Sequence, residues 1–195
     1  NAAGSAYIFK RIGTTWTQQA KLVSGDKITG DEFGYSVSID GSYAIVGARY
    51  QDLGALAVSN AGSAYIFVRN GDTWSEQAKL EADDASSNSE FGTFVSISGD
   101  TVIISAYREI NYTGSAYIFE RSGTTWTQVN KITASNATSL DQYGGSVAID
   151  NNTICVGAHI QGTYGSQSGA AYIYIRYPIA GLTFDGYNQL ALTNT

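Results

Sequence analysis

One short segment constrains this chain of 195 residues more than any other feature, because it is written four times. Gly-Ser-Ala-Tyr-Ile-Phe occurs at 4–9, 62–67 and 114–119 and returns as Gly-Ala-Ala-Tyr-Ile-Tyr at 169–174. Landmarks at fixed spacing follow the first three copies: a tryptophan 12 residues after the opening glycine, an aromatic-glycine pair 17 residues later, and a small-residue pair whose second member stands 15 residues after the aromatic. The chain is therefore a tandem array of one structural unit.

The spacing between units varies at a single place. The opening glycines are separated by 58, 52 and 55 residues, and all of this variation falls between the small-residue pair and the next glycine, at 49–61, 107–113 and 159–168. A fixed unit with one adaptable connection is typical of a rigid scaffold that carries a functional loop.

Each unit contains four blocks with strand signatures. Val37 and Ile39 alternate with Ser36 and Ser38, and the next block is a continuous apolar run such as 102–104. A run without alternation indicates burial on both faces of a sheet, whereas the tryptophan block alternates and suits a half-exposed outer strand. With 22 glycines and one proline, the composition suits short strands and turns. We predict an all-β fold of four-stranded antiparallel blades of β-propeller type, with a solenoid of stacked sheets as the competing architecture.

The blades are cut out of phase with the chain. We divide residues 1–176 into a partial unit at 1–22, complete units at 31–80 and 89–132, and three strands of a further unit at 141–176. Both incomplete ends carry the Tyr-Ile-Phe strand, so they are not complementary, and about three and a half units do not close a ring by themselves. We interpret residues 177–195 as a C-terminal hairpin or arm, which either substitutes for a fourth strand without the tryptophan or donates a strand to another molecule. Small residues such as Gly34, Ser36 and Gly47 would let adjacent blades approach closely.

The motif set Phe-Gly-x-x-Val-x-Ile, Val-Gly-Ala and Gly-Ser-Ala-Tyr-Ile-Phe resembles the FG-GAP repeat, up to about residue 176. The resemblance implies a β-propeller like the integrin α-subunit head, in extracellular or cell-surface proteins that bind proteins or glycans. The family's calcium loop is not matched, because the corresponding turns at 40–42, 98–100 and 150–152 carry one carboxylate each and calcium takes six to eight oxygen ligands. We therefore expect no metal and no cofactor.

Composition excludes other classes of protein. The formal charge of −6 without a Lys/Arg cluster argues against nucleic acid, and no apolar run is long enough to insert in a membrane. Cys155 aligns with Ile45 and Ile103, so we expect a small hydrophobe in a buried strand rather than a reactive thiol. The recurring tryptophans are expected to pack, and the carboxylates between blades are expected to be solvated loop charge.

Several loop residues are candidates for binding. The variable connections and the acidic blade-to-blade connections should lie on one side of the blades, and aromatic and arginine side chains there are typical interface anchors. The candidates are Arg49, Tyr50, Asp52, Tyr107, Arg108, Glu109, Tyr112, His159 and Tyr164. His159 has no marked nucleophile or carboxylate partner, so we expect no catalytic role. Asn111, Asn136 and Asn151 open Asn-x-Thr sequons in predicted loops or turns and are possible N-glycosylation sites.

The sequence therefore favours a non-enzymatic, extracellular or cell-surface protein that binds a protein or glycan ligand, or assembles into a surface fibre or matrix. Two alternatives stay open. One is a head-to-tail filament subunit, a homo-polymer completed by strand exchange between copies of itself. The other is a propeller domain attached to a secreted polysaccharide-active enzyme.

Overall fold

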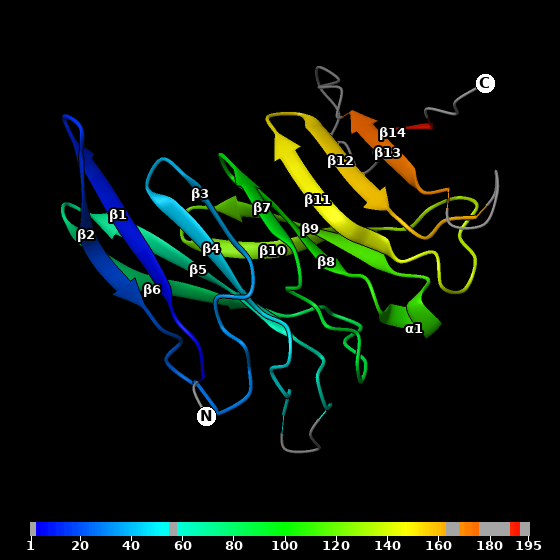
Figure 1. The fold of residues 1–195 in the computed structure, drawn as a ribbon, viewed down its shortest axis with the longest axis horizontal. Coiled ribbons are helices and arrows are strands. Elements are labelled where there is room, and N and C mark those ends of the chain that lie inside the picture. Colours follow the sequence, from blue (N-terminus) through cyan, green and yellow to red (C-terminus); the bar gives the residue numbers. More distant parts are fainter. Residues whose placement is uncertain (1–2, 55–57, 163–167, 176–187, 192–195) are drawn as a thin grey trace.

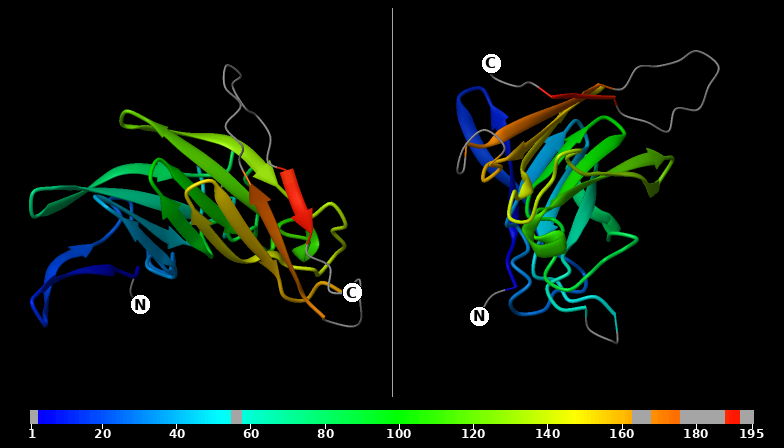
Figure 2. Two further views of the ribbon diagram at one scale, coloured as in Figure 1. Left: turned by 90° about the horizontal axis from the view of Figure 1, so that it is seen from above. Right: turned by 90° about the vertical axis from the view of Figure 1, so that its right-hand side faces the viewer.

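The computed structural model describes residues 3–54, 58–162, 168–175 and 188–191. Within them the chain forms antiparallel sheets that follow one another along an open arc, with the first and last sheets at opposite ends (Figure 1). Two further views show the same order of sheets without closure into a ring (Figure 2). This is the all-β, blade-type architecture that the repeat predicts.

Four sheets make up the arc, and we name them blades I to IV in chain order. Blade I has two strands, β1 (Ala6–Ile12) and β2 (Thr15–Leu22). Blade II contains β3 (Val37–Asp40), β4 (Tyr43–Ala48), β5 (Ser63–Asn70) and β6 (Thr73–Leu80). Blade III contains β7 (Val95–Ser98), β8 (Thr101–Ala106), β9 (Ser115–Ser122) and β10 (Thr125–Ile132). Blade IV contains β11 (Tyr143–Asp150), β12 (Thr153–Ala158), β13 (Ala170–Ile175) and β14 (Asn188–Ala191).

Consecutive strands pair within each blade, so every sheet is a meander of hairpins. A short helical segment, α1 (Glu109–Tyr112), lies between β8 and β9. At the far end, β14 pairs with β13 through the register Tyr174↔Gln189 and takes the place of a fourth strand. Of the two interpretations of the tail, the backbone at 188–191 follows the substitute strand, while 177–187 and 192–195 lie outside the described residues.

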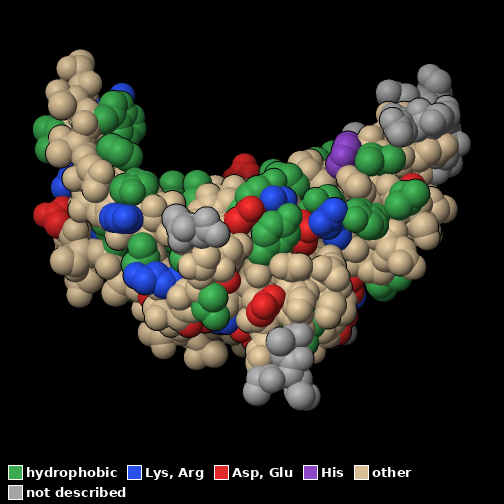
Figure 3. Space-filling model, turned by 60° about the horizontal axis from the view of Figure 1, so that its bottom comes forward, with side chains coloured by type: hydrophobic (Ala, Val, Ile, Leu, Met, Phe, Trp, Pro, Cys, Tyr) green, Lys and Arg blue, Asp and Glu red, His purple; other side chains and the backbone are tan. Residues whose placement is uncertain are grey.

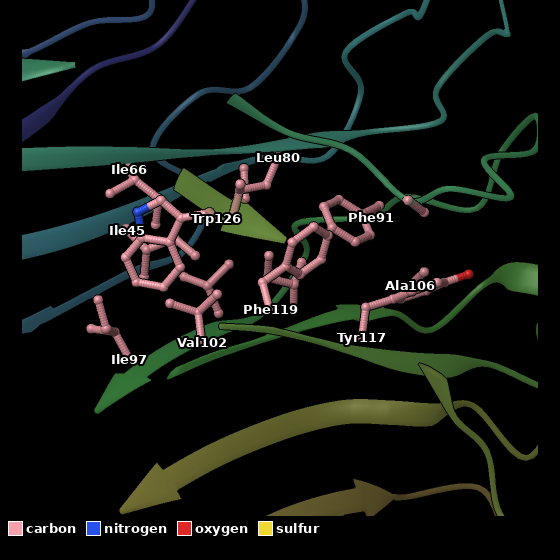
Figure 4. Close-up of a cluster of buried hydrophobic side chains, with 14 residues drawn as sticks. Ile45, Ile66, Leu80, Phe91, Ile97, Val102, Ala106, Tyr117, Phe119 and Trp126 are labelled. Carbon is pink, nitrogen blue, oxygen red and sulfur yellow. The ribbon is translucent and has the colours of Figure 1, made fainter. Parts of the chain in front are cut away.

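The core lies between blades rather than inside one sheet. Between blades II and III, Ile45 and Ile66 from one sheet meet Phe91, Tyr117 and Phe119 from the next, as Figure 4 shows. The ring of Phe91 lies 5.4 Å from Tyr117 and 6.1 Å from Phe119, both edge-to-face. The same edge-to-face arrangement recurs around Phe33 and around Tyr143. The aromatic of the aromatic-glycine pair therefore packs edge-to-face on the third strand of its own blade, within the core that this blade shares with its predecessor.

Glycine permits the close approach of neighbouring backbones. Gly62 forms a parallel bridge with Phe91, and a Cβ at Gly62 would lie 2.0 Å from the carbonyl oxygen of Phe91. A Cβ at Gly47 would lie 1.9 Å from the carbonyl oxygen of Gly92, and one at Gly34 would lie 2.6 Å from that of Ser5. Any side chain there would force the blades apart. The predicted role of the small residues in blade packing is confirmed.

Serine side chains connect the first strands of successive blades. The backbone N–H groups of Val95 and Ile97 in β7 donate to the hydroxyls of Ser36, directly before β3, at 3.1 Å and of Ser38 in β3 at 3.2 Å. In the same way Ile149 in β11 donates to Ser96 of β7 at 3.1 Å. The alternating serines of the first strand thus satisfy the outward N–H groups of the next blade.

The outer strands are joined by a glutamine and a tryptophan. The outer strand of each of the first three blades, β2, β6 or β10, carries one extra residue opposite the strand it pairs with. These extra residues are Gln19, Gln77 and Val129. The indole N–H of Trp74 donates to Gln19 Oε1, and that of Trp126 donates to Gln77 Oε1, each at 3.0 Å. The two bulges therefore aim an amide at the tryptophan of the next blade.

Two expectations about burial are wrong, one at each end of the arc. Cys155 is exposed, although its counterparts Ile45 and Ile103 are fully buried. It lies on the face of β12 that points away from blade III, and no further blade covers that face within the described residues. Trp16 is 64% exposed whereas Trp126 is 9% exposed, so a shared position in the repeat does not give Trp16 the packing role expected of it.

Candidate functional site

The connections between second and third strands and the connections between blades lie at the same end of the sheets, as predicted. The loops touch one another there: Asn88 N–H donates to the carbonyl oxygen of Ser59 at 2.8 Å, and Leu140 N–H donates to that of Asn111 at 3.2 Å. Figure 3 views this side, and charged and hydrophobic side chains lie together along its middle. We call it the loop face.

A buried carboxylate organises the centre of the loop face. Glu90 immediately precedes the aromatic-glycine pair of blade III, is 1% exposed and has a positive φ of 55°. Its Oε1 pairs with Arg108, and its Oε2 lies 3.7 Å from Arg49 Nη1. The two arginines come from the ends of β8 and β4, so one carboxylate links blades II and III. A buried carboxylate of this kind requires such compensation.

Arg49 lies among two acids and two tyrosines. Its Nε donates to Glu32 Oε2 at 2.8 Å, and its guanidinium lies 3.7 Å from the ring centre of Tyr35 and 4.5 Å from that of Tyr50. Burial disfavours the charged guanidinium, but the hydrogen bond to Glu32 outweighs it and the pKa of Arg49 is raised. The cation is therefore fixed in place, with the exposed Tyr35 ring against it.

Arg108 has a similar environment in the next blade. Its guanidinium lies 4.8 Å from the ring centre of Tyr112 and 6.0 Å from that of Tyr107. The hydrogen bond to Glu90 raises the pKa of Arg108, while burial and the nearby Glu90 charge raise that of the Tyr107 phenol. Both tyrosines and the arginine are half-buried, so each keeps part of its surface open to a partner.

The remaining predicted binding residues lie apart from this cluster. His159 is exposed and occupies the Arg49 position in blade IV, close to Gly145, where a Cβ would lie 2.5 Å from its Nδ1. Asp52 is exposed and accepts a hydrogen bond from Asn60 N–H at 2.8 Å. Tyr164 lies outside the described residues. The cluster therefore covers blades II and III.

Glu109 does not belong to the exposed surface. It is 4% exposed, and Lys131 Nζ donates to its Oε1 at 2.6 Å. Lys131 also pairs with Asp84 at 2.6 Å, and Tyr117 donates its phenol proton to Asp84 at 2.9 Å. Burial opposes the charge on Lys131, but its bonds to the two carboxylates raise its pKa. Glu109 supports the base of the loop and is not a candidate for partner contact.

Some of the acidic side chains between blades have a repeated structural role that sequence reasoning missed. Asp26 accepts a hydrogen bond from Tyr65 at 2.7 Å, and Asn136 accepts one from Tyr172 at 2.7 Å, as Asp84 does from Tyr117. Burial alone would raise the pKa of Asp26 and Asp84, yet hydrogen bonds from lysine and tyrosine lower it. A signal was present, since these three acceptors stand at equivalent positions of their units.

Sequence reasoning also missed Glu32, Tyr35 and Glu90. The signal for the two glutamates is their position directly before Phe33-Gly34 and Phe91-Gly92, where blade IV has Gln142. Glu32, Glu90 and Gln142 all have a positive φ, between 54° and 56°. At Glu90 this strained turn aims the carboxylate inward, whereas the Glu32 side chain is 42% exposed.

The sequon asparagines Asn111, Asn136 and Asn151 are all exposed. Among the described residues no group of three or more His, Cys, Asp or Glu side chains is arranged to hold a metal ion. The loop face offers guanidinium and tyrosine surfaces held by ion pairs, which is suited to binding a partner.

The described part of the chain contains no helix with the length and apolar character needed to cross a membrane. Among curated proteins, no sequence matches the chain. A family model described as the FG-GAP repeat matches three consecutive segments, 16–67, 74–119 and 126–174. Each match begins at a tryptophan, so the repeat takes the outer strand of one blade and the three inner strands of the next. With three matches that cover most of its length, the chain belongs to the FG-GAP repeat family.

Proposed function

We propose that this chain is a non-catalytic, extracellular interaction module whose loop face binds a protein or glycan partner. The observation that carries the proposal is the cluster of Arg49, Arg108 and their tyrosines around buried Glu90. FG-GAP repeats build β-propeller-like domains for interaction or structure and are typical of extracellular proteins, which supports the same assignment.

The charges of the cluster indicate the kind of partner. Arg49 and Arg108 are matched by Glu32 and Glu90, so the centre of the loop face has no net positive charge to capture a free anion. Ion pairs hold the guanidinium planes before any partner arrives, which lowers the entropic cost of binding. Flat aromatic and guanidinium surfaces suit a protein loop or the apolar face of a sugar ring.

The periphery of the loop face carries possible modification sites. In a eukaryotic source, glycans on Asn111 and Asn136 would flank the cluster, because both residues lie in connections at this end of the sheets. A glycan on Asn151 would lie at the β11–β12 turn instead. Partner contact at the centre and glycans at the edge are compatible.

A double substitution tests the binding face. Wild-type chain and the variant Tyr107→Ala/Arg108→Ala would be applied to a glycan array and to a panel of immobilised matrix proteins. We expect the variant to lose binding by about tenfold or more, since truncated interface anchors often cost 1–2 kcal/mol or more. The matched control is Arg11→Ala/Trp16→Ala, which removes an arginine–aromatic pair from blade I. Equal binding by wild type and the Tyr107/Arg108 variant would reject the loop face.

A second candidate function is assembly of copies into a filament. The exposed first-strand residues of blade II and the exposed outer face of blade IV favour it, because both are surfaces that neighbouring blades cover elsewhere in the molecule. Size-exclusion chromatography and negative-stain imaging of the purified chain provide the test. Fibres or concentration-dependent oligomers support assembly, and a monomer at all concentrations contradicts it.

A further inference from the structure

Two junctions between blades share one backbone arrangement and carry different side chains. At the junction of blades II and III, Asn88 N–H donates to the carbonyl oxygen of Ser59 at 2.8 Å, and at the junction of blades III and IV, Leu140 N–H donates to that of Asn111 at 3.2 Å. Asn88 and Leu140 are therefore equivalent, and the corresponding residue before blade II is Gly30. Asn88, Leu140 and Gly30 all have a positive φ, of 61°, 75° and 104°. This position requires a left-handed backbone in every unit.

Leu140 is poorly suited to that position. Glycine and asparagine adopt the left-handed backbone at low cost, whereas a leucine there is strained. Burial does not compensate for the strain, because Leu140 is 58% exposed. Its exposure is a property of the position, since Asn88 is also exposed although blades II and III lie on either side of it. The fold alone therefore gives no reason for a leucine at this position.

Ile110 shows the same conflict on the neighbouring loop. Residues 110–112 lie in α1 and have three successive positive φ values, of 46°, 55° and 64°. A β-branched residue with a positive φ is an outlier, because its branched Cβ crowds the backbone. Ile110 is nevertheless 65% exposed. Two backbone hydrogen bonds hold the turn, from Thr113 N–H to the carbonyl oxygen of Ile110 at 3.1 Å and from Gly114 N–H to that of Glu109 at 3.0 Å. The loop thus fixes a strained aliphatic residue at the surface.

The first junction is polar where the second is apolar. Asn60 Nδ2 donates to Asn88 Oδ1 at 3.0 Å, so the two amides satisfy each other across the junction of blades II and III. The equivalent of Asn60 is Tyr112, because each stands two residues before the opening glycine of a repeat. The ring centre of Tyr112 lies 4.8 Å from the Arg108 guanidinium. An aromatic and an aliphatic residue at the second junction therefore replace the amide pair of the first.

The chemistry of this surface indicates a protein partner rather than a glycan. We call Ile110, Tyr112 and Leu140 the junction patch. Its two aliphatic side chains offer no hydrogen-bonding group to a sugar hydroxyl and no aromatic face to a sugar ring. They can be buried against apolar side chains, which is the main favourable contribution to protein association. Tyr112 and Arg108 connect the patch to the cluster around Glu90, so one partner can reach both.

We propose that the junction patch is the hydrophobic anchor point of the loop face, where another protein packs an apolar side chain against Ile110 and Leu140, beside Arg108. The strained positions carry exposed aliphatic residues because these residues contact the partner and do not stabilise the fold. The inference rests on the proposed function and deepens it, because it selects a protein over a glycan as the partner and names the residues responsible.

A stability measurement tests the first step. Leu140→Asn gives this position the residue type that its equivalent, Asn88, already has. We expect the thermal midpoint of the chain to rise by about 2–4 °C, since asparagine relieves the strain and no buried contact is lost. The control Val129→Asn removes an exposed aliphatic side chain from β10 and should not raise the midpoint. A lower midpoint for Leu140→Asn would show that Leu140 stabilises the fold, and would overturn the proposal.

A displayed library of random peptides provides the binding probe. Peptides are selected on the immobilised wild-type chain, and their affinities are then measured for wild type and for Ile110→Asn/Leu140→Asn. We expect the enriched peptides to share an apolar residue and to bind the variant about tenfold or more weakly, as loss of interface anchors predicts. Val129→Asn should bind them like wild type. Equal affinity for wild type and the Ile110/Leu140 variant, or no enrichment of any peptide, would overturn the proposal.

Two further measurements separate the junction patch from the proposed function. If the enriched peptides lose affinity for Tyr107→Ala/Arg108→Ala but keep it for Ile110→Asn/Leu140→Asn, the loop face stands and the junction patch is rejected. If they are indifferent to both variants, both are rejected. A glycan-array signal that Ile110→Asn/Leu140→Asn abolishes would assign the patch to a glycan and reject the protein partner. A wild-type dimer in size-exclusion chromatography that the same variant dissociates would assign the patch to a second copy, and would also reject it.

Discussion

β3 and β7 have nearly the same sequence and different surroundings. Both present Val-Ser-Ile and pair with an apolar second strand through the same register. Yet Val37 and Ile39 are more than half exposed, whereas Val95 and Ile97 are buried under blade II. A repeat therefore determines which face of a strand is apolar, and the neighbouring blade determines whether that face is buried. The same difference separates Trp16 from Trp126 and Cys155 from Ile103.

The largest contrast should come from the tryptophans. We expect Trp126→Ala to lower the free energy of unfolding by about 3–5 kcal/mol, because it removes a buried aromatic side chain between blades II and III. Trp16→Ala should change it by less than about 0.5 kcal/mol, as exposed substitutions usually do. Urea denaturation of both variants measures the difference, and similar losses would contradict the distinct surroundings of the two residues.

The first strands provide the second comparison. Ile97→Ala should cost about 2–4 kcal/mol because it leaves a cavity in the core between blades II and III. Ile39→Ala should be nearly neutral in the isolated chain, within about 0.5 kcal/mol. Chemical denaturation at low and high protein concentration checks this. A large cost for Ile39→Ala that appears only at high concentration would show that copies of the chain cover the exposed face of β3.

Tyrosine ionisation distinguishes the internal interfaces from the end blade at alkaline pH. Burial, with the nearby Glu109 and Asp84, raises the pKa of Tyr117, and burial also raises that of Tyr65 and Tyr143. A raised folded pKa means that stability is full below the unfolded value of about 10 and is lost as pH rises above it. Thermal midpoints measured between pH 8 and 11 should therefore fall above pH 10.

Two variants show which tyrosine causes the loss of stability above pH 10. Tyr117→Phe should be less stable than wild type at pH 7, by about 1–2 kcal/mol for the lost hydrogen bond to Asp84. It should also show a shallower decline above pH 10, because one buried phenol no longer resists ionisation. Tyr7→Phe in blade I is the control and should keep the full decline, since Tyr7 is exposed. If both variants declined equally, burial of Tyr117 would not be the cause.

The smallest effect concerns the bulge residues. Gln77→Ala should cost about 0.5–1.5 kcal/mol, because the indole N–H of Trp126 loses its acceptor in a partly buried site. Val129→Ala removes the side chain at the equivalent bulge of blade III, where no tryptophan of blade IV is available for contact. We expect no measurable change in its thermal midpoint. A substantial loss there would indicate an unrecognised contact at the far end.

Much of the fold was predictable, because spacing and alternation are local properties of the sequence. The strand blocks, the small residues between blades and the common side of the loops all follow from the repeat. The exposure of residues at the two ends of the arc was not predictable, because Cys155 and its buried counterpart Ile103 occupy the same position of the repeat and differ in the blade that lies next to them. In the candidate site, Arg49, Tyr107 and Arg108 were identified as loop anchors. Glu90 was not, because its inward direction depends on a positive-φ turn that composition does not reveal.

Amide hydrogen exchange compares β3 with β7 directly, because it reports on the same backbone atoms in both strands. We expect the N–H groups of Val95 and Ile97, bonded to Ser36 and Ser38, to exchange slowly in the native chain. Those of Val37 and Ile39, which lie on the exposed face of β3, should exchange fast in the same sample. Equal protection of the two strands in the chain alone would contradict an open interface at β3.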